Sequence, residues 1–256
     1  MERKSNFLQL KQLIILLLLI SGMSVGAQKD PLRFRRTIYT SYISGNMEQW
    51  KQEINALQLQ AREEVMQREL LIAEYGYIAW SLGNGRKREA KQYLETASQR
   101  LDALYLAYPE DAELLALKGA FLGFEMDGAF YKAPFLGPKS LHYIMGSVAA
   151  DSLAPHGFIQ AGNAKYYLPP ALGGSKTEAL LYYETAEKNY QPLFQENPYD
   201  WRYLNLLIQM ADIYEALKKL NEAEETYQKI VRLAPSFSWV RDELYPAFIQ
   251  RTQNTN

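Results

Sequence analysis

The stretch 204–235 constrains the fold of this 256-residue chain more than any other part of its sequence. Leu207, Met210 and Tyr214 are large residues spaced three and four apart, so they share one face of a helix. Ala211 lies on the same face, and its small side chain lets a second helix approach closely. The spacing therefore predicts the first helix of a tightly packed pair.

A second helix is predicted directly after the first. Ala223 and Tyr227 stand four apart on one face, and Pro235 stops the helix. Asn221, with Glu224 three residues later, is predicted to cap its start. A hairpin of two such helices cannot bury its apolar face alone, so the rest of the chain should supply further hairpins that stack on it.

The combined pattern, with its best match over residues 204–237, resembles the tetratricopeptide repeat (TPR). The resemblance implies an all-α solenoid of stacked helical hairpins. It also implies that the protein works by binding another protein or a peptide, since stacked hairpins offer a long preformed surface.

An internal repetition supports the array. The segment that begins at Ala90 recurs at Ala179, and each copy runs to a proline nineteen residues after its first alanine, at Pro109 and Pro198. In the C-terminal hairpin the distance from Ala223 to the proline is only twelve residues. The two earlier second helices are therefore predicted to be one heptad longer.

We therefore expect an all-α, TPR-like α-solenoid of about five helical hairpins plus a C-terminal capping helix. The domain division is residues 1–27 as a signal peptide, 28–60 as an N-terminal helical hairpin and 61–252 as the TPR-like array. The hairpins are expected at about 31–60, 68–108, 111–152, 155–197 and 204–235, and the capping helix at about 236–250.

The N-terminus has the three parts of a secretory signal peptide. Residues 1–12 are basic, 13–20 are uninterruptedly apolar, and Val25-Gly26-Ala27 is a small-residue site after which a signal peptidase could cut. The alternative is a retained membrane anchor, but the apolar run is far shorter than the ~20 residues that span a bilayer. With no cysteine for lipid attachment, a periplasmic or secreted protein is expected, without a transmembrane segment after cleavage.

Composition gives no support for a catalytic, cofactor-binding or metal site. The chain has two histidines, on different predicted segments, and no cysteine, so no zinc-ligand pattern is present. Residues 174–177 (Gly-Ser-Lys-Thr) only partly match a phosphate-binding loop and are interpreted as a turn and a helix cap. A net charge of −1 and a pI near 6.2 argue against nucleic-acid binding. We expect a protein that is not an enzyme.

Two insertions interrupt the repeat pattern, one in the third hairpin and one in the fourth. They carry the similar segments Pro134–Gly137 and Pro170–Gly173, which are predicted to be loops that emerge side by side. Aromatic residues cluster at or next to them: Phe130, Tyr131, Phe135, Tyr166 and Tyr167. These residues are candidate partner-binding positions, with packing of the loops onto the helix ends as the alternative.

The groove lined by the first helices is the second candidate surface. In the fifth hairpin it should include Asn205, Ile208, Asp212 and Glu215. The carboxylate-clamp groove known in the family uses lysine, arginine and asparagine. Two acidic groups here favour a neutral or basic extended peptide instead.

The sequence thus predicts an exported TPR-like scaffold that binds a protein or peptide partner in the bacterial envelope. The alternative is a small-molecule (solute) binding accessory component of an envelope transport system, in which such an array closes around a pore. The identity of the partner and the oligomeric state are left open.

Overall fold

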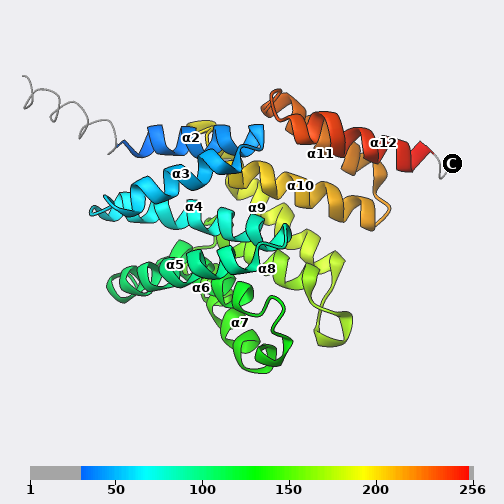
Figure 1. Ribbon diagram of the computed structural model, residues 1–256. Helices are drawn as coiled ribbons and strands as arrows, with labels where there is room; N and C mark the ends of the chain where they lie inside the picture. Colours follow the sequence, from blue (N-terminus) through cyan, green and yellow to red (C-terminus); the bar gives the residue numbers. More distant parts are fainter. Residues whose placement is uncertain (1–29, 254–256) are drawn as a thin grey trace, which may run out of the picture.

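The computed structural model describes residues 30–253, apart from the side chain of Phe130. Every regular element in this part of the chain is helical (Figure 1). The all-α prediction is confirmed. The signal peptide lies outside the described residues and stays a prediction, and no helix within 30–253 is long and apolar enough to cross a membrane.

The helices form five consecutive hairpins and a C-terminal extension. The hairpins are α2 (Pro31–Ser44) with α3 (Met47–Gln58), α4 (Glu64–Gly83) with α5 (Lys87–Ala107), α6 (Ala112–Glu125) with α7 (Ala133–Ala150), α8 (Pro155–Tyr167) with α9 (Lys176–Glu196), and α10 (Trp201–Ala216) with α11 (Leu220–Leu233). Short 3-10 turns, η1 (Phe130–Lys132) and η2 (Pro170–Leu172), precede α7 and α9. The extension is a π-helical turn, η3 (Trp239–Leu244), that continues into α12 (Tyr245–Gln253).

The lengths of the second helices match the spacing in the sequence. Helices α5 and α9 each have 21 residues and α11 has 14, a difference of 21 − 14 = 7 residues, which is one heptad. Whole heptads preserve the register of the packed face, so the longer helices present the same side to their neighbours.

Side-chain caps and a left-handed glycine define several helix ends. The Asp30 side chain accepts a hydrogen bond from the backbone N–H of Leu32, and Gly45 ends α2 in the left-handed conformation with φ 69°. Ser175 caps α9 through the N–H of Glu178. The predicted cap at Asn221 is wrong: α11 begins at Leu220, one residue earlier, without a side-chain cap.

One of the two predicted loops is also wrong. The segment Pro134–Gly137 forms the first turn of α7, because a proline at the start of a helix lacks only an N–H that has no helical partner there. The extra residues of the third hairpin are instead in the connection 126–132, which includes η1. The segment Pro170–Gly173 does lie outside α8 and α9, as η2 followed by Gly173 with φ 90°.

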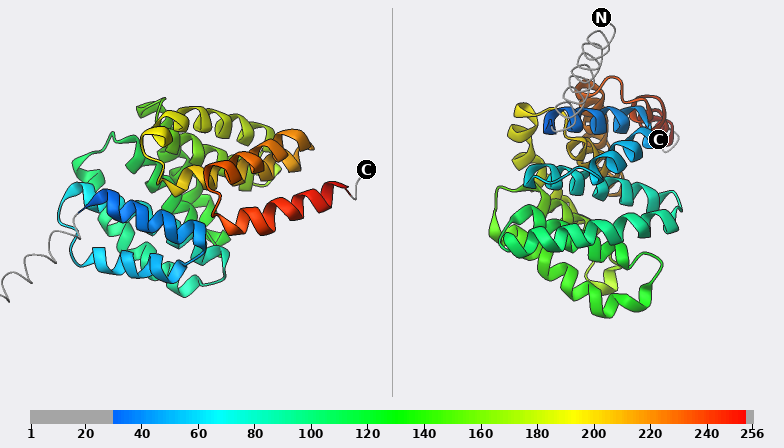
Figure 2. Two further views of the ribbon diagram at one scale, coloured as in Figure 1. Left: turned by 90° about the horizontal axis from the view of Figure 1, so that it is seen from above. Right: turned by 60° about the vertical axis from the view of Figure 1, so that its left-hand side comes forward.

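The array curls until its two ends meet. In Figure 1 the chain runs from α2 (blue) down to α7 (green) and returns through α8 and α9. Helix α10 therefore packs against α2 as well as against α9, and both views of Figure 2 show the C-terminal helices near the N-terminal pair. This closure brings first helices from opposite ends of the chain together.

Candidate functional site

A partly buried ionic cluster lies where the first helices converge. The Arg202 guanidinium, in the first turn of α10, binds both carboxylate oxygens of Asp200 at 2.7 to 3.3 Å. Its third nitrogen donates to Glu113 of α6 at 2.7 Å. Tyr190 of α9 donates its hydroxyl to Asp200 at 2.6 Å. One arginine thus joins the third, fourth and fifth hairpins.

His156, in the first turn of α8, completes this cluster. Its Nε2 lies 3.2 Å from Glu113, and its ring meets Tyr190 edge-on at 5.4 Å. Burial, reinforced by the charge of Arg202, lowers the pKa of His156 to about 4, so the imidazole is neutral at pH 7. Burial alone would raise the pKa of Asp200 and Glu113, but the Arg202 charge holds both below their usual values.

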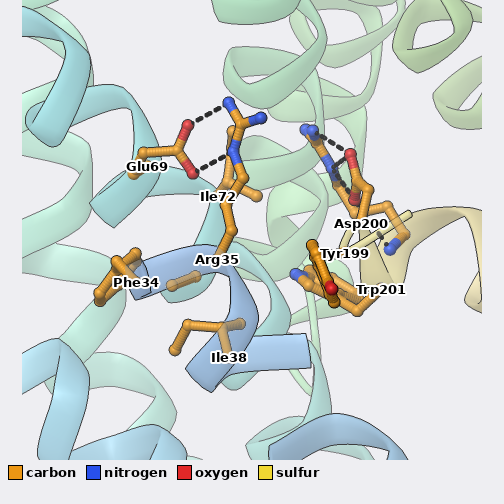
Figure 3. Close-up of a pocket in the computed structure, with 10 residues that line it drawn as sticks. Phe34, Arg35, Ile38, Glu69, Ile72, Tyr199, Asp200 and Trp201 are labelled. Carbon is orange, nitrogen blue, oxygen red and sulfur yellow. Dashed lines mark hydrogen bonds and ion pairs between the residues drawn. The ribbon is translucent and has the colours of Figure 1, made fainter. Parts of the chain in front are cut away.

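A second ion pair faces this cluster across a small cavity. Arg35 of α2 binds both carboxylate oxygens of Glu69 of α4, as Figure 3 shows, and this bonding raises the pKa of Arg35. The cavity between this pair and Asp200 has a volume of about 20 Å³, room for roughly one water molecule. We name the Arg35–Glu69 pair and the cluster around Arg202 the clasp, because they lie where the array closes. The cavity between them is too small for a ligand larger than a water molecule.

Aromatic rings pack next to the clasp and fill the space between the first helices. Trp201 lies 5.2 Å from Trp50, 5.5 Å from Tyr42 and 6.2 Å from Tyr75, measured between ring centroids. The rings leave no room for a side chain at Gly76, where a Cβ would lie 2.6 Å from Trp201. The interior is therefore packed at this level.

The candidate tyrosines of the fourth hairpin lie at the end of α8. Tyr167 is 70 % exposed, whereas Tyr166 is partly buried and packs against the core; their rings meet edge-on at 5.0 Å. The turn that follows requires glycine at position 174, because a Cβ there would lie 1.8 Å from the carbonyl oxygen of Leu168.

The four candidate residues on α10 have different surroundings. Ile208 is buried, with 5 % exposure. Asn205 accepts a hydrogen bond from Tyr42 at 3.3 Å. Glu215 forms a two-point ion pair with Arg251 of α12 at 2.8 and 2.9 Å, which lowers its pKa. Asp212 is exposed and takes part in none of the ion pairs described within 30–253; its described hydrogen bond, from the Tyr227 hydroxyl, is long at 3.4 Å.

The structure brings Asp212 within electrostatic range of the α8 tyrosines. Burial raises the pKa of Tyr166 and Tyr167, and the Asp212 charge raises both further. Burial likewise raises the pKa of Asp212 itself, although its side chain remains accessible to solvent. We name Tyr166, Tyr167 and Asp212 the tyrosine–aspartate face.

The remaining candidates belong to the third hairpin. Tyr131 in η1 and Phe135 in the first turn of α7 are 77 % and 75 % exposed. The backbone of Phe130 lies in η1. Tyr131 and Phe135 are available to a partner, but from short helical turns rather than from a loop.

Sequence reasoning missed the ionic cluster. Glu113, His156 and the Asp200–Arg202 pair are tens of residues apart in the sequence, and none of them follows the repeat spacing. The available signal was Asp200, which precedes α10 and caps it. No group of three or more histidine, cysteine or acidic side chains that could hold a metal ion occurs within the described part of the chain.

Comparison with known proteins gives one match, to a repeat family over part of the chain. No curated protein matches the chain. Residues 204–237, which cover most of α10 and all of α11, match the tetratricopeptide repeat family. The fifth hairpin is therefore similar to a tetratricopeptide repeat, and the paired packing of the other hairpins is consistent with a TPR-like solenoid.

Proposed function

We propose that this protein is a scaffold whose tyrosine–aspartate face binds an extended, positively charged segment of another protein. The observation that carries the proposal is Asp212, an exposed carboxylate among tyrosine side chains with no ion pair among those described. The match of this same hairpin to the tetratricopeptide repeat supports a protein partner.

The chemistry of the face favours a cation. The protein atoms around Asp212 disfavour its charged form, and a lysine or arginine side chain would stabilise that form by a charge-assisted hydrogen bond. Tyrosine rings nearby add a cation–π contribution of ~0.5–1 kcal/mol at an exposed site. The neighbouring carboxylate, Glu215, is already neutralised by Arg251 and offers less.

The array also limits the cost of binding. Tyr166 and Tyr167 lie at the end of α8, before a turn that requires glycine at position 174, and Asp212 stands on α10, which packs against α9 and α11. A partner segment would therefore meet a preformed surface, and most of the ordering cost would fall on the partner.

We further propose that the protein acts in the bacterial envelope, in the periplasm or after secretion. The basic and apolar segments of residues 1–20 and the small residues before Gln28 support export with cleavage after Ala27. Cell fractionation followed by N-terminal sequencing tests this directly; a mature protein that still begins at Met1 would contradict it.

The binding proposal is tested with the mature protein, residues 28–256, and a displayed library of random peptides. We expect the selected peptides to contain lysine or arginine. Changing that residue to glutamine in a synthetic, fluorescently labelled peptide should weaken binding by about tenfold, measured by anisotropy at low salt. Asp212→Asn should remove the difference between the two peptides.

Two matched pairs of variants locate the surface. Glu215→Gln removes a carboxylate from the same helix and should reduce affinity less than Asp212→Asn does. Tyr131→Ala with Phe135→Ala tests the third hairpin separately from Tyr166→Ala with Tyr167→Ala. Selected peptides without a cation, or affinity that Asp212→Asn leaves unchanged, would overturn the proposal, provided circular dichroism shows equal helicity.

A further inference from the structure

A pocket of about 260 Å³ lies between α5 of the second hairpin and α6 and α7 of the third hairpin. Leu101 of α5 and Phe121 of α6 contribute to its lining and are almost completely buried, with 2 % and 3 % exposure. The pocket also includes Lys139 in the first half of α7, the helix that follows the long connection 126–132. It therefore combines an apolar floor with a rim supplied by three helices.

One cation in this pocket is fixed in place. Lys118 of α6 lies 2.6 Å from Asp102 of α5, and only 16 % of its side chain is exposed. Its ammonium lies over the rings of Tyr105 and Tyr143, at 4.9 and 5.2 Å from their centroids, and these rings meet edge-on at 5.8 Å. The pair is neutral overall and gives the pocket a rigid polar wall.

Two further charges line the pocket without such partners. Glu125 of α6 and Lys139 of α7 have opposite signs, and neither takes part in an ion pair described for residues 30–253. A ligand with a single charge could pair with one of them and would leave the other unmatched. A ligand with both an ammonium and a carboxylate group could pair with both.

We propose that this pocket binds a small zwitterion with an apolar side chain, of the size and chemistry of a free α-amino acid. The ammonium group pairs with Glu125, the carboxylate pairs with Lys139, and the apolar side chain covers Phe121. The volume is slightly below the ~300–1,000 Å³ of pockets for drug-sized ligands, which suits a molecule of this size. None of the residues that line this pocket belongs to the tyrosine–aspartate face.

The test is titration calorimetry of the mature protein with L-phenylalanine and L-leucine as probes. 3-Phenylpropionate, which lacks the ammonium, and phenethylamine, which lacks the carboxylate, keep the ring and remove one charge each. We expect saturable binding of at least one amino acid, and binding of both single-charge analogues that is at least about fivefold weaker than that of phenylalanine.

Variants connect the binding to this pocket. Lys139→Met and Glu125→Gln should each weaken amino-acid binding by about fivefold or more, and the first should affect phenethylamine least because that probe has no carboxylate. Lys188→Met and Glu196→Gln on α9 remove the same charges from exposed positions and serve as controls.

Three results would overturn the proposal. They are no saturable binding of either amino acid up to about 20 mM, equal binding of the single-charge analogues, or equal losses in the control variants. Lys139 and Glu125 lie at the surface or half-buried, so their replacement should leave the fold intact, which circular dichroism verifies.

Discussion

The third and fifth hairpins each pack two helices closely together, but they use different residue types to do so. In the fifth hairpin, α10 packs against α11, and the small residues Ala211 of α10 and Ala223 of α11 are both completely buried, with 0 % exposure. In the third hairpin, α6 and α7 meet at Gly119, where a Cβ would lie 2.5 Å from Ile144. Ser140 and Ser147 of α7 donate their hydroxyls to backbone carbonyls of Gly119 and Ala112 at 2.7 and 2.6 Å.

The difference explains why only one of the two hairpins is recognisable from its sequence. Helices that pack through alanines can keep the standard residue spacing of the repeat. That spacing is the tetratricopeptide pattern matched at residues 204–237. Contacts between glycine, isoleucine and serine hydroxyls depend on one particular geometry and follow no general pattern. The third hairpin should consequently be less tolerant of substitution, and the predictions that follow test this difference.

The largest effect is expected from the ion pair that joins the two hairpins. Arg202→Met leaves the partly buried carboxylates of Asp200 and Glu113 without their cation, which should lower the free energy of unfolding by ~3 kcal/mol, the lower end of the range for fully buried pairs. Urea unfolding followed by circular dichroism measures it. A loss below about 1 kcal/mol would show that packing alone holds the third hairpin to the fifth.

The pH dependence of stability tests the cluster around Arg202 in the unsubstituted protein. His156 has a pKa of about 4 in the folded chain, against about 6.5 unfolded. As pH falls from 6.5 towards 4, the unfolded chain binds a proton that the folded chain does not. His156 should therefore destabilise the fold by up to ~3 kcal/mol over this range.

Urea unfolding at several pH values provides the measurement. His156→Gln should remove this part of the pH dependence, leaving that of the carboxylates. His142→Gln is the control, because His142 is exposed on α7. Equal slopes for wild type and His156→Gln between pH 6.5 and 4 would contradict a neutral, buried His156.

Replacing Gly119 by alanine gives the third hairpin the residue that the fifth has at the equivalent position. The change should nevertheless destabilise the protein by ~1–3 kcal/mol, because the new Cβ would overlap Ile144. Gly123→Ala in the same helix meets no atom within 4 Å and should stabilise by ~0.5–1 kcal/mol. If both substitutions stabilise the protein, the third hairpin accepts alanine at its helix contact as the fifth does, and the proposed difference between them is wrong.

These positions also show how far the sequence determines the structure in advance. The distances from Ala90 and Ala179 to their prolines predicted the lengths of α5 and α9, since helix length and register are local properties. Pro134 misled, because a proline begins a helix as readily as it interrupts one.

The candidate site was predictable only in part. Tyr166, Tyr167 and Asp212 were identified by composition and spacing, but their common location depends on how α8 and α10 are placed by the whole array. The pairing of Arg202 with Glu113 lies beyond sequence reasoning of this kind, because these residues are 202 − 113 = 89 positions apart and have no shared pattern.

The smallest effect is expected from Ser147→Ala, which tests the serine hydrogen bonds separately from the close packing around Gly119. Ser147 is completely buried, and its hydroxyl donates to the carbonyl of Ala112 in the first turn of α6. Ser147→Ala should lower the free energy of unfolding by ~1 kcal/mol, since it removes one hydrogen bond and leaves the carbonyl with its helical partner. Thr226 of α11 is buried too, but it bonds within its own helix, so Thr226→Ser, which keeps the hydroxyl, should cost less. A Ser147→Ala variant as stable as wild type would mean that the third hairpin depends on the shape of its contact surface alone, and that its serines are present for their small size, as the alanines are in the fifth.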